Sequence, residues 1–566
     1  MLDATDASSD PMGPLLFVFA AALLLTAPLA LWVLARYRRA VARAMGIGGP
    51  PGGSGDTAHP VEPAAAARSE PPPRLADGLH PLEADAPGRL LVRRARRSVR
   101  GTALAVAGAG FAYAAAAGLL VVAAQGAELL PLRTLVVVLV HAWPVVPGLL
   151  VVTGAGRVAW LVAPLAYVLL LAAVAGSFLP QAVALWGIFA GPPTLALVAL
   201  SARSLRAVGP LLFLITAGAL GGALLSLDAA LWALQSGFPG ARLLARGAAI
   251  AAFAGGLLVG LLGLRALARG WVRRRLSDQL LLLAAWWLVF TFWLGLFLRS
   301  LGGAGGATAL SAFAAFALVL ALLLALRRRE ATRHSARPLL LLRVFGSRSR
   351  SERLFVEVAR WWRHLGPVRL VAAPDLASAT FEPDELLSFL AGRLGDRFVD
   401  APADLERRLA GFRDVPDPDG RYRVEKLYCR DHTWRQAVAR LVERSDVVLV
   451  DLRGYTAANL GVREELSCLV ETVPAGRIVL LEDDSTDEPA ARAALAAAWA
   501  ACSRHSPNFA AAYPVTLHLG RQGVRALLAA LCDAAALAHP GAAPNPAAST
   551  TTPGPTQDGH PSAGGR

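Results

Sequence analysis

The chain changes character near residue 337, and this change constrains its fold more than any other feature. Before that residue, apolar runs long enough to cross a bilayer alternate with clusters of arginine. After it, short apolar runs alternate with amphipathic segments, as in a soluble α/β domain. The chain has 566 residues, of which 55% are hydrophobic, and its mean hydropathy is +0.48. This composition is typical of a membrane protein rather than a soluble enzyme.

The formal net charge of +15 could indicate a nucleic-acid partner, but its distribution argues against one. The only lysine is Lys426, and alanine, glycine and proline are abundant, a pattern typical of GC-rich bacterial coding. Many of the arginines flank apolar runs, and no basic stripe is interleaved with aromatic residues. We therefore expect no nucleic-acid partner.

Nine apolar runs, most of about 18 residues or more, predict membrane-spanning helices. The first is not expected to be a cleaved signal peptide, because acidic residues precede it and a basic cluster follows it. The fifth is interrupted by Gly191, Pro192 and Pro193, and proline inside a span kinks the helix. The runs lie near residues 14–35, 102–124, 134–153, 158–178, 182–201, 208–226, 247–264, 280–298 and 306–326.

Arginine clusters lie mainly at alternate ends of these runs, after the first, fifth, seventh and ninth and before the second. Positive charge stays in the cytoplasm, so the N-terminus is expected outside and the C-terminal domain in the cytosol. The predicted location is the bacterial inner membrane, with the lipid bilayer as a partner. The sequence predicts an N-terminal anchor, a disordered basic cytosolic loop rich in proline and glycine, a multi-pass region, an α/β domain and a disordered tail, over residues 1–36, 37–101, 102–330, 338–538 and 539–566.

The predicted spans contain almost no ionisable groups, whereas ion-coupled transporters place such groups at mid-membrane depth. His141 is the main candidate, and Asp228 lies at an outer edge. Transport with a regulatory cytosolic domain is therefore an alternative function, and not the preferred one.

Strands and helices alternate after residue 337, which predicts a parallel sheet covered on both faces. Strands are expected at 338–345, 368–372, 423–429, 446–452, 477–482 and 515–519, and helices at 349–364, 382–394, 403–412, 433–443, 459–473, 488–502 and 524–538. In such sheets, ligands bind beyond the carboxyl ends of the strands, where the winding direction reverses.

Polar residues follow two of these strands. Ser347 and Arg348 follow the first strand, and Asp451 and Arg453 end the central one. A guanidinium in this position can hold a phosphate through paired hydrogen bonds, so these four residues are predicted to bind a ligand.

No metal site is predicted. Asp483, Asp484 and Asp487 are interpreted as a solvated cap for the following helix. Cys429 and His432 provide only two ligands. The four cysteines contain no C-x-x-C pair and fit a reduced cytosol.

Residues 338–535 resemble the TIR (Toll/interleukin-1 receptor) and nucleoside-deoxyribosyltransferase-like group of flavodoxin-like folds. The resemblance rests on the first strand with its polar loop, from Val344 to Arg348, and on Glu465 followed by Leu466 in the helix after a strongly apolar strand. The chain as a whole resembles bacterial multi-pass membrane proteins that carry such a domain at the C-terminus.

The resemblance implies an α-helical membrane bundle followed by a flavodoxin-like domain that serves signalling or nucleotide binding. It also implies an alternative, in which the domain is an N-glycosidase that cleaves NAD or a related nucleotide, with Glu465 as the catalytic residue. A carboxylate there would stabilise positive charge developing on the ribose. TIR-like domains often assemble, so self-association is a further expectation. The residues identify no cofactor.

Overall fold

The computed structural model describes residues 28, 31–32, 34–41, 43, 86–124, 131–176, 179–200, 209–235, 240–300, 306–331, 334–344, 350–371, 389, 398–429, 432–509 and 514–538. Most of the predicted first span, most of the predicted loop at 37–101 and the predicted tail at 539–566 lie outside these residues. The same holds for all but residue 389 of the helix predicted at 382–394.

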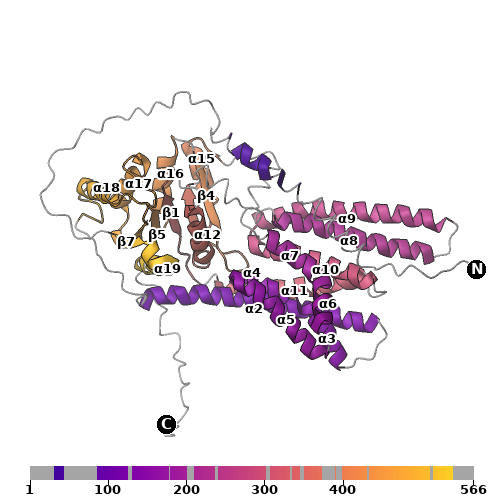
Figure 1. Cartoon of the computed structure of the whole chain (residues 1–566). Helices are drawn as coiled ribbons and strands as arrows, with labels where there is room; N and C mark the ends of the chain where they lie inside the picture. The colour runs from indigo at the N-terminus through magenta and orange to yellow at the C-terminus, as the bar shows by residue number, and fades with distance from the viewer. Residues whose placement is uncertain are drawn as a thin grey trace, which may run out of the picture.

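Long apolar helices make up the described part of the chain before residue 332 (Figure 1). Seven helical segments are long and apolar enough to cross a membrane, and the bent pair of α6 and α7 provides an eighth if it counts as one span. The eight runs predicted from residue 102 onward each coincide with one of these segments, and the length and composition of these helices fit a multi-pass membrane protein. The helices are α2 (Ala86–Ala124), α3 (Pro131–Ala142), α4 (Val145–Thr153), α5 (Arg157–Ala175), α6 (Leu179–Phe189), α7 (Gly191–Leu200), α8 (Gly209–Gln235), α9 (Ala241–Val272), α10 (Asp278–Ser300) and α11 (Gly306–Ala331).

The predicted interruption of the fifth span is confirmed, because α6 and α7 meet at an angle of 57°. Pro193 follows this break, and its carbonyl accepts a 2.9 Å hydrogen bond from the indole nitrogen of Trp286 in α10. Trp143 similarly donates to the hydroxyl of Thr194 at 2.9 Å. Neighbouring helices thus supply polar partners at a kink that proline creates.

The region after residue 337 forms a seven-stranded sheet in which every pairing is parallel. The strand order is β3-β4-β2-β1-β5-β6-β7. The predicted parallel sheet is therefore confirmed, and six of its strands lie where the sequence predicts them. The strands are β1 (Leu339–Arg343), β2 (Val368–Val371), β3 (Phe398–Val399), β4 (Val424–Cys429), β5 (Val447–Asp451), β6 (Ile478–Glu482) and β7 (Val515–His518).

Helices cover both faces of this sheet. Leu339 and Leu341 pack in one core with α12 (Arg350–Trp362) and α19 (Leu519–Leu537), and this core continues into the membrane bundle. Leu340 and Leu342 point to the opposite face and pack in a second core. That core contains α15 (Pro402–Ala410), α16 (Trp434–Glu443), α17 (Leu460–Thr472) and α18 (Glu488–Ala501). The continuous apolar character of β1 follows from burial on both faces.

Two elements differ from the sequence prediction. Helix α2 begins at Ala86, so residues 86–101, predicted as part of a disordered loop, are helical. This extension is stabilised by packing, because Leu91 and Ala95 are buried and α2 contacts α19. The short strand β3 is not predicted, since two residues are too few to show a periodicity.

Charged side chains join the α/β domain to the end of the membrane bundle. We call this contact the domain joint, formed by residues 271–278 at the turn between α9 and α10, Arg363 after α12, and residues 413–425 before and within β4. The Arg423 guanidinium lies 3.7 Å from the ring centroid of Trp271 and donates to that residue's carbonyl oxygen at 2.6 Å. Ser277 donates to the buried carboxylate of Asp419.

A second part of the domain joint centres on Asp278, the first residue of α10. Arg363 forms paired hydrogen bonds with its two carboxylate oxygens at 3.0 and 2.9 Å, and Arg421 lies 3.4 Å away. Arg274 has a φ of 55°, the only positive value among the described residues other than glycine, and donates to the carbonyl of Val415 at 3.0 Å. The turn between α9 and α10 therefore adopts a conformation in which its side chains contact the α/β domain.

Candidate functional site

The winding direction of the sheet reverses between β1 and β5. From β1 the chain proceeds to β2 and β4 on one side, and it then crosses to β5, β6 and β7 on the other. Ligands of open parallel sheets bind beyond the strand ends at such a reversal. Arg343, the last residue of β1, is the register partner of Asp451, the last residue of β5. Two neighbouring strands therefore each end in a charged residue at the point where the winding direction reverses.

The structure brings Asp451 and Arg453 together as a buried ion pair. The Arg453 Nε and Nη2 atoms each lie 2.7 Å from a different carboxylate oxygen of Asp451, and both side chains are about 95% buried. Burial disfavours the Arg453 charge, but the hydrogen bonds and negative charge of Asp451 outweigh burial and raise the pKa of Arg453. The Arg453 guanidinium thus remains charged, and the pair holds the loop after β5 in a defined shape.

The loops after β5 and β6 are hydrogen bonded to each other. The Asp487 backbone NH donates to the carbonyl of Tyr455 at 3.0 Å, and the Thr486 hydroxyl donates to the carbonyl of Leu452 at 3.1 Å. Asp487 caps α18 by accepting a 3.1 Å hydrogen bond from the backbone NH of Ala490. The predicted capping role is thus confirmed for Asp487. The polar loops after β5 and β6 therefore lie together at this edge of the sheet.

Tyr455 lies in the same loop and is fully buried. Its hydroxyl has no hydrogen-bond partner among the described residues, and burial raises its pKa. A buried hydroxyl without a partner is energetically costly.

Glu465 is buried in the second turn of α17, and its Oε2 atom has no hydrogen-bond partner among the described residues. Burial, aided by the negative charge of Glu464, raises the pKa of Glu465 to about 8. Glu464 itself is exposed and paired with Arg435. The raised pKa favours the protonated, neutral carboxyl at neutral pH, whereas the predicted catalytic role requires the negative charge.

The predicted site is brought together only in part. Asp451 and Arg453 are in direct contact, and Arg343 adds a third charged residue that the sequence prediction missed. The sequence feature that could have identified Arg343 is its position as a single arginine at the end of an otherwise apolar strand. No described contact joins Glu465 to the Asp451–Arg453 pair, and Ser347 and Arg348 lie outside the described residues. Within the described part of the chain, no three His, Cys, Asp or Glu side chains form a metal-binding group.

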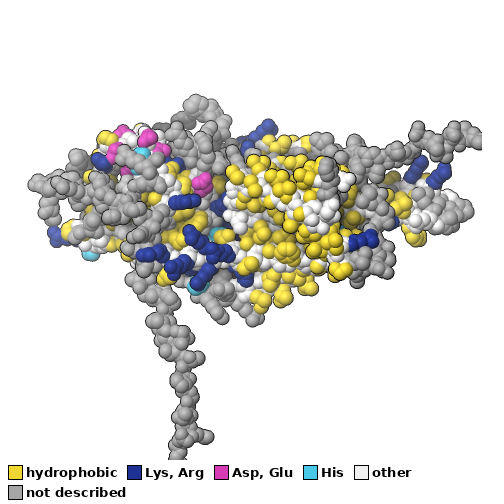
Figure 2. Space-filling view, turned by 60° about the horizontal axis from the view of Figure 1, so that its bottom comes forward, with side chains coloured by type: hydrophobic (Ala, Val, Ile, Leu, Met, Phe, Trp, Pro, Cys, Tyr) yellow, Lys and Arg dark blue, Asp and Glu magenta, His cyan; other side chains and the backbone are white. Residues whose placement is uncertain are grey.

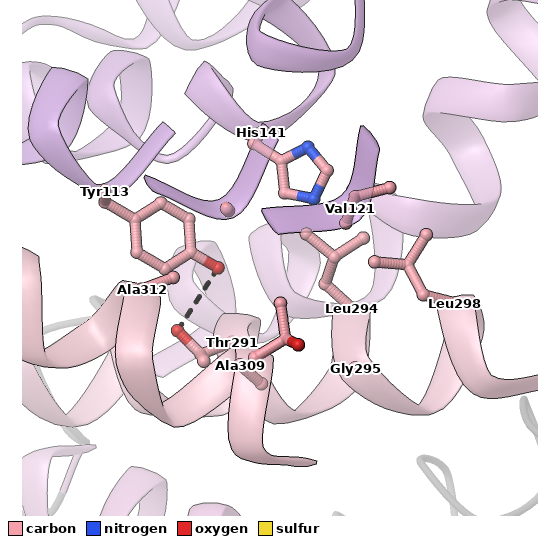
Figure 3. Close-up of a pocket in the computed structure, with 11 residues that line it drawn as sticks. Tyr113, Val121, His141, Thr291, Leu294, Gly295, Leu298, Ala309 and Ala312 are labelled. Atoms are coloured by element: carbon pink, nitrogen blue, oxygen red, sulfur yellow. Dashed lines mark hydrogen bonds between the residues drawn. The ribbon is translucent and has the colours of Figure 1, made fainter. Parts of the chain in front are cut away.

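The membrane bundle contains a small cavity beside His141, lined mainly by apolar side chains (Figure 3). Its volume is about 20 Å³, and it is lined by Tyr113, Thr291 and Thr308 as well as by apolar side chains. His141 Nδ1 lies 2.8 Å from the carbonyl of Val137, whereas its Nε2 atom is buried and has no partner among the described residues. The volume accommodates one water molecule.

Asp228 forms an ion pair with Arg299 at 2.8 Å and accepts a 3.1 Å hydrogen bond from the backbone NH of Gly306. It therefore holds together the ends of three helices, α8, α10 and α11. This structural role accounts for a carboxylate at the edge of the bundle.

Comparison of the chain with protein-family models, curated proteins and solved structures finds no match. The function is therefore argued from the geometry of this chain alone.

Proposed function

We propose that this protein presents a TIR-like, flavodoxin-like α/β domain at the cytosolic face of the bacterial inner membrane, and that the domain binds a nucleotide-type ligand for signalling. The supporting observation is the reversal of the winding direction between β1 and β5. Arg343 and Asp451 are the last residues of these strands, and Arg453 lies in the loop after β5. Arginine side chains at this edge suit a phosphate, which accepts paired hydrogen bonds from a guanidinium group. The arginine clusters at alternate span ends support the cytosolic orientation.

Ligand binding is tested with the full-length protein in lipid nanodiscs, because the domain joint ties the α/β domain to the bundle. Adding NAD, ADP-ribose or AMP is expected to raise the thermal unfolding temperature of the wild-type protein. The double variant D451N/R453Q should lose this shift, since it removes both charges and keeps hydrogen-bonding groups in place.

The matched control is E488Q/R492Q, which removes an exposed Glu–Arg pair from α18 in the same domain. It should retain the full ligand response. Binding that survives in D451N/R453Q would exclude the reversal point as the site.

The alternative activity is hydrolysis of the N-glycosidic bond of NAD or a related nucleotide. Water would add to the ribose carbon, and nicotinamide would leave with the electrons of the broken bond. Glu465 must be ionised to stabilise the positive ribose. A cationic nicotinamide ring bound beside it would lower its raised pKa, so the ligand itself would favour the ionised form.

This activity is tested by incubating the full-length protein with NAD at high protein concentration, which also favours self-association. Release of nicotinamide is expected to disappear in Glu465→Gln and to persist in Glu464→Gln. Release that survives Glu465→Gln would reject the assigned role. The absence of release together with a ligand-induced thermal shift would favour a binding and signalling module.

The second alternative, a transporter regulated by the α/β domain, has one supporting observation, the small cavity beside His141. The cavity is the size of a water molecule, so this conformation provides no room for a larger substrate there. Uptake of a solute by proteoliposomes that is lost in His141→Leu would establish this function.

A further inference from the structure

The N-terminal part of α2 has two opposite faces. Leu91 and Ala95 are buried, and Gly88 packs so closely on α19 that an added Cβ would lie 1.9 Å from an Asp533 carboxylate oxygen. Arg94 donates to the carbonyl of Ser335 at 2.9 Å on the flank of this packed face. The other face carries a group of exposed arginines, which we call the arginine face: Arg89, Arg93, Arg96, Arg97 and Arg100.

The spacing of these residues places them together. With 3.6 residues per turn, the five side chains fall within about 100° of the helix circumference. Figure 2 shows basic side chains gathered beside the hydrophobic band of the bundle, in the region where Figure 1 places the N-terminal part of α2. None of the five has an ion-pair partner among the described residues.

The arginine face is unfavourable for the helix itself. Five pairs of these arginines stand three or four residues apart, and like charges at that spacing repel across a helix surface. Helix α2 has no acidic residue to offset them, and its first turn, where the macrodipole favours negative charge, contains none either. The local electrostatics therefore require an anion from outside the helix.

The position of the face identifies that anion. Helix α2 is continuous over 39 residues and enters its apolar segment at about Thr102. At a rise of 1.5 Å per residue, Arg96, Arg97 and Arg100 lie about 3–9 Å from that point. The headgroup layer on each side of a bilayer is roughly 5–8 Å thick, so these three side chains reach it. Arg89 and Arg93 lie about 14–20 Å away, beyond the range of strong unscreened attraction.

We propose that Arg96, Arg97 and Arg100, the part of the arginine face nearest the bilayer, bind anionic phospholipid headgroups at the membrane surface. Because the opposite face of the same helix packs on α19, bound lipid also secures the α/β domain beside the bilayer. The lipid phosphates neutralise the repulsion between the arginines, and bidentate guanidinium–phosphate hydrogen bonds stabilise the complex.

The test uses the full-length protein, stripped of bound lipid in a neutral detergent and titrated with phosphatidylglycerol or phosphatidylcholine, with bound lipid counted by native mass spectrometry. Wild-type protein is expected to prefer phosphatidylglycerol. The variant R97Q/R100Q should bind phosphatidylglycerol about 30-fold more weakly. R97K/R100K keeps the charge and should retain most of the affinity.

The matched control is R89Q/R93Q, which removes two charges from the same face farther from the membrane, and its affinity should fall less than about 3-fold. Thermal unfolding gives a second readout. In neutral lipid, R97Q/R100Q should be as stable as the wild type or more stable, because repulsion is relieved. In phosphatidylglycerol it should be less stable than the wild type.

Unchanged lipid binding in R97Q/R100Q would overturn the proposal, and so would equal losses in the two double variants. A labelled single-stranded DNA is tested in parallel. Tight DNA binding that is lost in R97Q/R100Q would reassign the arginine face to nucleic acid.

Discussion

Glu465 shows at the residue scale how burial alters the chemistry of a side chain. Its ordinary pKa of 4.5 is raised to about 8 in the folded domain. The folded state therefore holds its proton more tightly than the unfolded state. The resulting stabilisation is complete below about pH 4.5 and is lost as the pH rises toward 8, at up to roughly 1.4 kcal/mol per pH unit.

We expect Glu465→Gln to remove this part of the pH dependence, because the amide does not ionise. Unfolding temperatures of the wild type and the variant are compared at about pH 5 and about pH 9. The wild type should lose more stability than the variant over this interval. Parallel pH profiles would show that Glu465 has an ordinary pKa.

The Asp451–Arg453 pair supports a second prediction at this scale. Asp451→Ala leaves the Arg453 charge buried without its partner and should destabilise the domain by about 3–5 kcal/mol. Replacing both residues with leucine and methionine should cost less than the single change. Denaturant unfolding of the two variants measures the difference. If the double variant were as unstable as Asp451→Ala, the unpaired charge of Arg453 would not be the cause of the lost stability.

At the scale of elements, the backbones of α8 and α9 pack closely against each other at glycine positions. A Cβ added at Gly256 would lie 2.5 Å from the Cα of Gly222 and 2.6 Å from the carbonyl oxygen of Gly218. Glycines four residues apart on each helix allow this approach, as in other membrane helix pairs. The two helices can remain in contact only while these positions lack a side chain.

Gly256→Ala is therefore expected to separate the two helices and lower the thermal unfolding temperature of the full-length protein. Gly255→Ala is the control, since an added Cβ meets nothing within 4 Å and alanine favours a helix. Equal unfolding temperatures for the two variants would contradict the packing geometry.

At the scale of the whole molecule, the domain joint connects two parts that have different environments. Its contacts are charged and largely buried, so removing one partner leaves others uncompensated. Asp278→Asn should weaken the contacts of Arg363 and Arg421 and loosen the α/β domain from the bundle. Hydrogen exchange of the backbone amides in residues 413–425 is expected to increase.

The control for this variant is Asp228→Asn, which removes a carboxylate near the opposite end of α10. It should leave exchange in residues 413–425 unchanged. A similar increase in both variants would indicate general destabilisation of the bundle rather than release of the joint.

Orientation is the other prediction for the whole molecule. Alkaline phosphatase, which is active only outside the cytoplasm, is fused after residue 540. The arginine distribution predicts an inactive fusion, because the C-terminal domain should remain in the cytosol. A fluorescent protein at the same position should be bright. Phosphatase activity would overturn this topology.

Local patterns in the sequence determined most of the elements. Apolar runs from residue 102 onward predicted the spans, and short apolar runs predicted the described strands except β3. These predictions were possible because a buried segment consists of consecutive apolar residues. The sequence also placed Asp451 and Arg453 at the end of one apolar strand, but it predicted them to bind a ligand and not each other. The break at Pro192 and Pro193 was also visible locally.

Only the tertiary structure decided how distant residues meet. It placed Arg343 beside Asp451, raised the pKa of Glu465 through burial, and joined Asp278 to Arg363 and Arg421. These outcomes depend on strand order and on packing between segments far apart in the sequence. It also decided that residues 86–101 are helical, because their arginines oppose a helix locally and packing against α19 stabilises it.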